Sequence, residues 1–461
     1  MDQPTPQTRR GLVLLMTTLG SFMTPFMSSS INIALPSIGR EFGLTTNLLG
    51  WVATSFLLAA AVFLVPFGKL ADISGRKKIF GWGIAVYALA SYLSAAAPSG
   101  VLLIVFRAIQ GFGGAMMFST AVALLTSVYP PGERGKALGI NTAATYVGLS
   151  FGPFAGGLLT QSFGWRSIFL FNGLLGTVLV ILVIALLKGE WAEPKKEKFD
   201  TSGALVFGLF LLGLMYGFSL LPRAGGFLFV LAGLAAGLVF VVWESKAAAP
   251  VLNINLFRKN AVFAFSNLAA LINYSATFAV TYLGSLYLQY IKGMSPRQAG
   301  FVLVVQPVIM AVFSPLTGRL SDRVEPRLLA SAGMGLSAVG LLLFVFLTSA
   351  TPVSYMAAGL AILGFGFALF SSPNTNAVMS SVDRGTYGVA SATLGTMRLT
   401  GQMLSMGIAM LIIGLTVGRV KITPEHFPAF LRSLKYAFIL FSALCALGVF
   451  ASHARGTMNR Q

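Results

Sequence analysis

The chain has 461 residues, of which 56% are hydrophobic and only 10% are charged. Soluble globular domains are about 25% charged, so a soluble protein is excluded and a polytopic helical membrane protein is predicted. The net charge of +19 does not indicate nucleic-acid binding, because the cations lie in short gaps between apolar runs rather than on a soluble face or tail.

Apolar runs long enough to cross a bilayer, about 20 residues each, recur along the whole chain. The first follows "MDQPTPQTRR", and we expect it to be a transmembrane helix rather than a cleaved signal peptide. The runs are continuous rather than alternating, which excludes a β-barrel. Fourteen spans are predicted, at 11–34, 47–67, 79–97, 101–128, 137–159, 165–187, 202–221, 226–243, 261–288, 298–317, 328–348, 353–378, 389–417 and 433–452.

This order predicts an all-α membrane fold in three parts. They are an N-terminal six-helix bundle (1–190), a linker with two extra transmembrane helices (191–259) and a C-terminal six-helix bundle (260–461). With the N-terminus inside, 21 lysines and arginines fall on the inner side and 9 on the outer side. Cations favour the cytoplasmic side, so we expect a multi-pass inner or plasma membrane protein with both termini in the cytoplasm. The single cysteine, Cys445, is expected to serve packing.

The segment "GKLADISGRKK" (68–78) concentrates charge between the second and third spans. A related segment, "GRLSDRVEPR" (318–327), occupies the same place in the second set of six spans, so that Asp322 falls on Asp72. Internal repeats of this kind are typical of secondary transporters.

These segments resemble signatures of the major facilitator superfamily. Residues 68–77 match its G-x-L-A-D-x-x-G-R-K motif, "RAIQGFGG" (107–114) matches the R-x-x-Q-G-x-G motif of helix four, and "GLSFGPFAGG" (148–157) matches the G-x-x-x-G-P-x-x-G-G motif of helix five. The last motif is typical of exporters. With fourteen predicted helices, the chain resembles the drug:proton antiporter branch of the superfamily, which includes the EmrB- and QacA-type pumps.

The resemblance implies a set of gating residues. Asp72 would help to lock one conformation through charges and a helix terminus of the other half, the alternative being an ordinary solvated cytoplasmic loop. Helix five would form a hinge or seal between the bundles, since glycines allow close packing and a proline allows bending; ordinary small-residue packing is the alternative. The gating set is Gly68, Asp72, Gly75, Arg76, Lys77, Asp322, Gly148, Gly152, Pro153, Gly156 and Gly157.

Proton antiport requires a group that titrates within the membrane. Each of the thirteen carboxylates, however, is predicted to lie in a loop, in a tail or at a helix end. Related pumps carry an aspartate in helix one, in a pattern like L-D-x-T-I-V-N-V-A-L-P. Here "FMSSSINIALP" has Met27 at that place, although Asn32 and Pro36 align. The usual proton or cation site of helix one is therefore absent, which weighs against cationic-drug recognition and against proton coupling itself.

Two arginines lie within predicted spans. Arg107, with Gln110 beside it in helix four, has either a structural and gating role or a direct coupling role. Arg398 is about ten residues into helix thirteen, near the midplane. A buried cation without an acid partner is costly, so we expect Arg398 to face water, a polar cavity or an anion. Snorkelling or a misplaced helix end is the alternative.

Other polar residues at helix depth would either complete a substrate path with Arg398 or form interhelical hydrogen bonds. The candidates for substrate contact are Asn32, Asn273, Tyr274, Gln306, Asn374 and Gln402.

The sequence therefore predicts a secondary active exporter of amphiphilic organic compounds, a multidrug efflux protein that works by alternating access. Proton coupling is implied by the family resemblance, and the positive cavity favours neutral or anionic compounds. The main alternative is an exporter or flippase of an anionic lipid or metabolite; a transporter-like receptor without flux is a further one. No cofactor, metal cluster or catalytic group is indicated. The expected partners are the substrate, membrane lipids and protons, and the expected state is a monomer.

Overall fold

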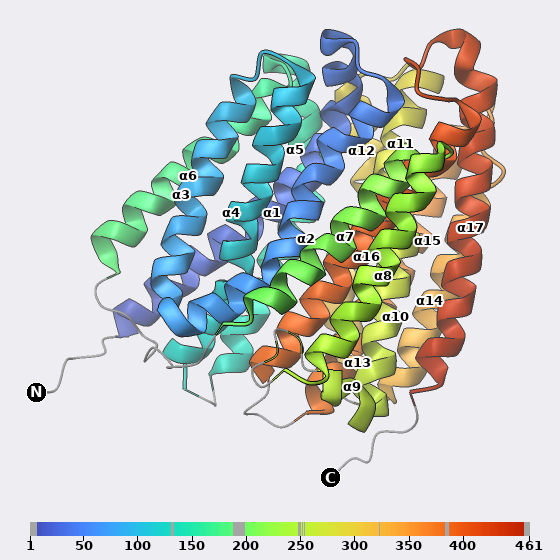
Figure 1. Ribbon diagram of the computed structural model, residues 1–461. Helices are drawn as coiled ribbons and strands as arrows, with labels where there is room; N and C mark the ends of the chain where they lie inside the picture. Colours follow the sequence, from blue (N-terminus) through green and yellow to red (C-terminus); the bar gives the residue numbers. More distant parts are fainter. Residues whose placement is uncertain are drawn as a thin grey trace, which may run out of the picture.

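A computed structural model describes residues 7–130, 133–187, 199–247, 250, 252, 254–321, 323–382 and 387–455. Over these residues the regular secondary structure is helical. The helices form one elongated bundle, in which α1 (Gln7–Phe42) begins at the same end where α17 (Phe427–His453) finishes (Figure 1). We call this the near end of the bundle and the opposite one the far end.

The first six helices pack together as one half of the bundle, coloured blue to green in Figure 1. The turn between the second and third helices is made by Gly75, whose φ of 106° is a conformation that residues with a side chain rarely adopt. The remaining helices of this half are α2 (Thr46–Ser74), α3 (Arg76–Ala95), α4 (Gly100–Val128), α5 (Arg134–Phe163) and α6 (Arg166–Leu186).

The other half is built from residues 261–453 and has more interrupted helices than predicted. The expected span at 298–317 is divided at Val304, because Pro307 lacks the N–H that the Leu303 carbonyl would bond in a continuous helix. The expected span at 261–288 ends in a π-helical turn. The elements are α10 (Ala261–Thr277), α11 (Ala279–Leu286), η1 (Tyr287–Ile291), α12 (Pro296–Leu303), α13 (Val305–Ser321), α14 (Pro326–Phe344), α15 (Val353–Ser380), α16 (Tyr387–Thr416), η3 (Pro424–His426) and α17.

Twelve helical stretches among the described residues are long and apolar enough to cross a membrane. The sequence predicted fourteen transmembrane spans. When helices are judged by length and composition, this expectation is not met. The two predicted spans that fall short, 79–97 and 137–159, are helical and lie in α3 and α5. Both helices begin with cations and carry hydroxyl groups along their length, which lowers their apolar character.

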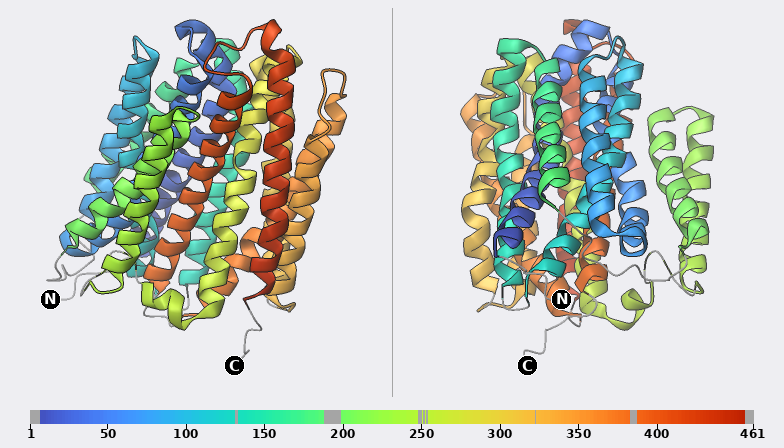
Figure 2. Two further views of the ribbon diagram at one scale, coloured as in Figure 1. Left: turned by 45° about the vertical axis from the view of Figure 1, so that its right-hand side comes forward. Right: turned by 90° about the vertical axis from the view of Figure 1, so that its left-hand side faces the viewer.

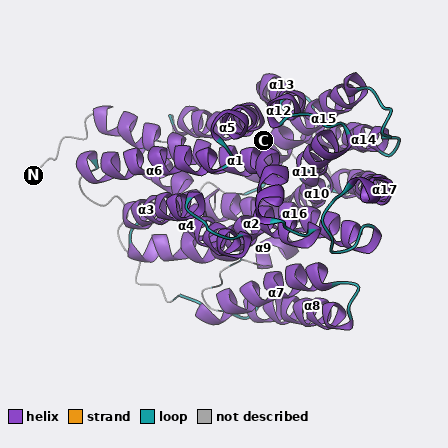
Figure 3. Ribbon diagram, turned by 90° about the horizontal axis from the view of Figure 1, so that it is seen from above, coloured by secondary structure: helices purple, strands orange, loops and turns teal. Residues whose placement is uncertain are grey.

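Two further helices, α7 (Thr201–Leu220) and α8 (Ala224–Glu244), form a hairpin beside the bundle (Figure 2), and the short α9 (Ile254–Lys259) follows. α7 packs against α2 of the first half and α16 of the second, as Figure 3 shows from above. One buried cluster joins all three, with Val62 from α2, Leu211 from α7 and Met403 from α16. The hairpin therefore covers the seam where α2 meets α16.

The opposite seam lies between α5 and the pair α12 and α13. Phe151 of α5 and Val308 of α13 line a largely apolar groove there. Both side chains are more than two fifths exposed, so this seam is open on its outer surface where the first is covered.

Glycine contacts repeat between the halves. A Cβ on Gly111 of α4 would collide with the carbonyl oxygen of Phe56 in α2, and a Cβ on Gly364 of α15 would collide with that of Gln306 in α13. Gly148 likewise lies against the backbone of α1, and its counterpart Gly401 against α10. Each half thus uses the same close approaches, which is structural support for the internal repeat.

Candidate substrate site between the two halves

Arg398 is the charged centre of the site. Its Nη2 donates to the Thr375 hydroxyl of α15 at 2.6 Å, and its guanidinium lies 5.8 Å from the centroid of the Tyr274 ring of α10. Its Nε is buried without a hydrogen-bond partner. A guanidinium with an unused donor can bind an anion or a neutral acceptor.

Aromatic and thioether side chains form the wall next to Arg398. The rings of Tyr274 and Phe367 meet edge to face, with centroids 5.2 Å apart. Met310 of α13 completes this buried cluster, and Tyr146 of α5 packs against it. Such a wall offers an apolar and polarizable surface to an aromatic or hydrophobic ligand.

Tyr146 brings the first half of the molecule to this site. Its hydroxyl shares a 2.9 Å hydrogen bond with Ser371 of α15. One helical turn further along α5, the Ser150 hydroxyl donates to the Pro307 carbonyl of α13 at 2.8 Å. The site therefore lies where the two halves touch, which is where an alternating-access mechanism places its substrate.

The other predicted substrate residues divide into two groups. Asn273 is fully buried, and neither atom of its amide has a hydrogen-bond partner; Gln306 is buried and Gln402 is half-buried. Asn32 and Asn374 instead serve the helices, since their amides donate to the carbonyls of Ser28 and Ser266. Of the whole set, the structure brings Tyr274 into contact with Arg398.

Arg107 lies in a sealed environment inside the first half. It is fully buried, with Nε donating to the Val52 carbonyl at 3.2 Å and Nη1 to Gln110 at 2.6 Å. Gln110 donates in turn to the Ser91 hydroxyl of α3 at 2.7 Å. The guanidinium also sits 4.7 Å from the centroid of the Phe56 ring. These contacts tie α4 to α2 and α3.

The small residues of α5 face two partners. A Cβ on Gly148, Gly152 or Gly156 would press on α1. Gly157 instead lies against the Pro296 carbonyl of α12, and Gly300 of α12 lies against the Pro153 carbonyl. This helix therefore contacts its own half and the opposite half at once.

The charged loop forms a tight helix junction at the near end. Gly68 lies opposite Ser119, as Gly318 of the repeat lies opposite Ser372. Arg76 donates to the Ala123 carbonyl of α4 at 3.2 Å, and Lys77 lies in the first turn of α3.

Two acids of the gating set are not described at side-chain level. Asp72 falls in α2 with its side chain outside the described part. Asp322 lies outside the described residues altogether.

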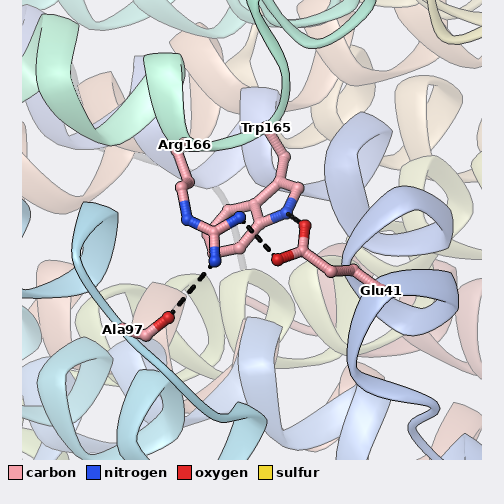
Figure 4. Close-up of polar contacts among 4 residues, drawn as sticks. All are labelled: Glu41, Ala97, Trp165 and Arg166. Atoms are coloured by element: carbon pink, nitrogen blue, oxygen red, sulfur yellow. Dashed lines mark hydrogen bonds and ion pairs between the residues drawn. The ribbon is translucent and has the colours of Figure 1, made fainter.

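A polar cluster at the far end was missed at the sequence level (Figure 4). Glu41 accepts from the Trp165 indole at 2.7 Å and from Arg166 at 2.6 Å, and Arg166 also donates to the Ala97 carbonyl at 3.4 Å. It ties α1 to the start of α6 and the end of α3. In the sequence, this cluster is indicated only by the adjacent Trp165 and Arg166, which follow the turn at Gly164.

Arg455, which the sequence assigned to the tail, is also buried. Its guanidinium donates to the Ser452 carbonyl and hydroxyl and to the Ser266 hydroxyl. Burial lowers its pKa to about 10, so it stays charged at neutral pH. It fixes the end of α17 to α10.

Comparison with known proteins agrees with this architecture. The profile of the Major Facilitator Superfamily matches residues 17–406 and, in a second match, residues 266–455. The chain belongs to the Major Facilitator Superfamily. The two matched ranges of this facilitator together span most of the chain.

Named relatives of the facilitator are transporters. It is 27% identical over 448 residues to the riboflavin transporter RibZ of Clostridioides difficile, covering 96% of each chain. It is 30% identical over 403 residues to the multidrug resistance protein Stp of Mycobacterium tuberculosis, covering 86% of this chain and 74% of Stp.

A solved structure of a bacterial homologue of the lysosomal transporter Spinster superposes with a TM-score of 0.67 at 17% identity. The match covers 98% of this facilitator and 97% of that chain. The fold is therefore shared across the full length.

Proposed function

We propose that this facilitator is a fourteen-helix exporter of the drug:proton antiporter branch, with α3 and α5 crossing the membrane beside the twelve more apolar spans. Both helices pack along apolar neighbours, α3 on α4 and α5 on α1, which supports this count. The near end would be cytoplasmic, because the cation-rich segments, including 68–78, lie there. Substrates would cross by rocking of the two halves about the Arg398 site.

The observation that carries the substrate class is the incomplete hydrogen bonding of Arg398. The Arg398 side chain is half-buried and its Nε is fully buried, and its one described hydrogen bond goes to a neutral hydroxyl rather than to a carboxylate. An acceptor or anionic group on the substrate would use the free Nε, while the Tyr274 and Phe367 rings would hold an apolar or aromatic body. We therefore propose amphiphilic organic compounds that are neutral or negatively charged.

The same site would serve an exporter or flippase of an anionic lipid or metabolite. Both functions use Arg398 as the acceptor-binding group and differ in the size of the apolar part of the substrate. Flux of an acidic phospholipid between leaflets would favour the second function over multidrug efflux.

The test is transport by the full chain in proteoliposomes. Riboflavin serves as an uncharged probe, fluorescein as an anionic one and ethidium as a cationic one. Arg398→Gln should reduce anion flux at least tenfold relative to cation flux, because one charge-assisted hydrogen bond is worth about 1.5–3 kcal/mol. Arg223→Gln, which alters an exposed arginine in the α7–α8 turn, is the matched control and should change neither.

An unaltered charge preference in Arg398→Gln would remove this residue from the site. Imposing proton and sodium gradients one at a time tests the coupling. Stimulation by an inward proton gradient is expected, and dependence on sodium alone would contradict proton coupling.

A further inference from the structure

A proline in α1 leaves one backbone acceptor free at the far end. Pro36 lies inside the helix and has no N–H. In a continuous helix that N–H would bond the carbonyl four residues earlier, which belongs to Asn32. A buried carbonyl without a donor is unfavourable, so Asn32 requires a partner from outside α1.

That partner comes from the other half of the molecule. The Ser285 hydroxyl of α11 donates to the Asn32 carbonyl at 2.6 Å. Gln289 Nε2 donates to the next carbonyl, that of Ile33, at 2.9 Å, and to the Ser285 hydroxyl at 3.0 Å. Ser285 is fully buried and Gln289 is 8% exposed, so water does not compete for these bonds.

The local geometry of the second half suits this contact. Gln289 lies in the π-helical turn η1, directly after α11. A π-turn changes the direction of the side chains that follow it and is frequently found at functional sites. Ser285, in α11, and Gln289 are four residues apart and therefore share one face of the helix, where both contact the same stretch of α1 and each other.

We propose that Ser285 and Gln289 form a latch that holds the far end of the transporter closed, with the carbonyl released by Pro36 as its receptor. Other bonds also join the halves there, including that of the Thr46 hydroxyl to the Gly418 carbonyl at 2.7 Å. The latch differs from these bonds because Pro36 has no N–H, so the Asn32 carbonyl cannot form the usual hydrogen bond within α1. When the far ends separate, the Asn32 carbonyl loses its donor, so the closed state is favoured.

This inference gives the "NIALP" stretch a physical role through its backbone, with Asn32 acting by its carbonyl and Pro36 by its missing N–H. It concerns the conformational equilibrium and holds for any transported compound.

The test measures the distance between the far ends of the two halves. Ala96, after α3, and Ala350, before α15, are both exposed there, and each is replaced by cysteine and spin-labelled in a Cys445→Ser background. Double electron–electron resonance on the full chain in nanodiscs should show a dominant short distance. Ser285→Ala and Gln289→Ala should each raise the ratio of long to short distances about fivefold, as expected for one lost hydrogen bond.

Ser442→Ala is the matched control. Its hydroxyl donates to the Ala338 carbonyl at 2.9 Å, a bond of the same kind within a single half. This variant should leave the distance distribution unchanged. Wild-type distributions in both Ser285→Ala and Gln289→Ala would overturn the latch.

The role of Pro36 is tested by a double-mutant cycle. Pro36→Ala restores an N–H for the Asn32 carbonyl, so Ser285→Ala should shift the equilibrium much less in that background. If Ser285→Ala changed the ratio of long to short distances equally with proline and with alanine at position 36, the role assigned to Pro36 would be overturned.

Discussion

The two intramembrane arginines have opposite surroundings, and this difference separates their roles. Arg107 has described acceptors on two helices and lies under an aromatic ring inside one half. Arg398 lies at the interface of the halves with an unused Nε. The repeat sharpens the contrast, because the positions that correspond to Ser91, Arg107 and Gln110 in the second half are the fully buried leucines Leu341, Leu360 and Leu363.

We predict that the buried polar trio of the first half is replaceable as a unit. Gln110→Leu alone leaves the Arg107 charge without its side-chain partner and should destabilise the protein by about 1.5–3 kcal/mol. The triple variant Ser91→Leu, Arg107→Leu, Gln110→Leu copies the second half and should recover most of that loss. Thermal unfolding in detergent measures both.

Transport by the triple variant resolves the two hypotheses for Arg107. Retained transport is expected for a structural role. A stable triple variant without transport would instead assign Arg107 to coupling.

Sequence reasoning found Arg398 and Tyr274 because a charge or a phenol at helix depth is conspicuous. It missed Tyr146, Phe367 and Ser371, because pairing of α5 with α15 depends on packing between distant segments. Arg455 was missed for a different reason, since a cation beyond the last apolar run resembles a solvated tail residue.

At the scale of helices, α5 makes close backbone contacts with the opposite half. Gly300 of α12 lies against the Pro153 carbonyl, and Gly157 against the Pro296 carbonyl. The seal between the bundles that the motif implies stays a prediction, and it depends on this close packing of α5 on α12.

We predict that Gly300→Leu pushes α5 and α12 apart at the far end and reduces transport at least tenfold with normal insertion. The control is Gly139→Leu on α5, where an added Cβ meets nothing within 4 Å. Transport rates in proteoliposomes, normalised to reconstituted protein, measure the effect. Equal rates for the two variants would exclude a packing requirement at this crossing.

At the scale of the whole molecule, the repeat and the charge bias could be predicted because they are properties of spacing and composition. The break at Val304 follows from Pro307, which is visible in the sequence but which a search for apolar runs passes over. The π-helical turn η1 could not be predicted, since the contacts of its side chains are made with a distant helix. The twelve strongly apolar spans also show how α3 and α5 escape a criterion based on composition alone: α3 begins with three cations, and α5 carries glycine, asparagine and hydroxyl residues along its length.

Orientation is predicted from the charge bias and can be checked in cells. In a Cys445→Ser background, Ala96→Cys and Ala350→Cys at the far end should react with a membrane-impermeant maleimide from outside. Arg258→Cys in α9, at the near end, should react only after permeabilisation. The reverse pattern would place the termini outside.

The hairpin of α7 and α8 packs on both halves at the seam between α2 and α16. Among the described helices, the seam between α5 and α13 has no such cover. Because the hairpin holds the two halves together along the seam between α2 and α16, the halves should separate mainly along the opposite seam. The rocking axis should therefore be displaced toward α2 and α16. The widest angular excursion should occur at α5 and α13, so lateral pressure from the bilayer would act on the two flanks unequally.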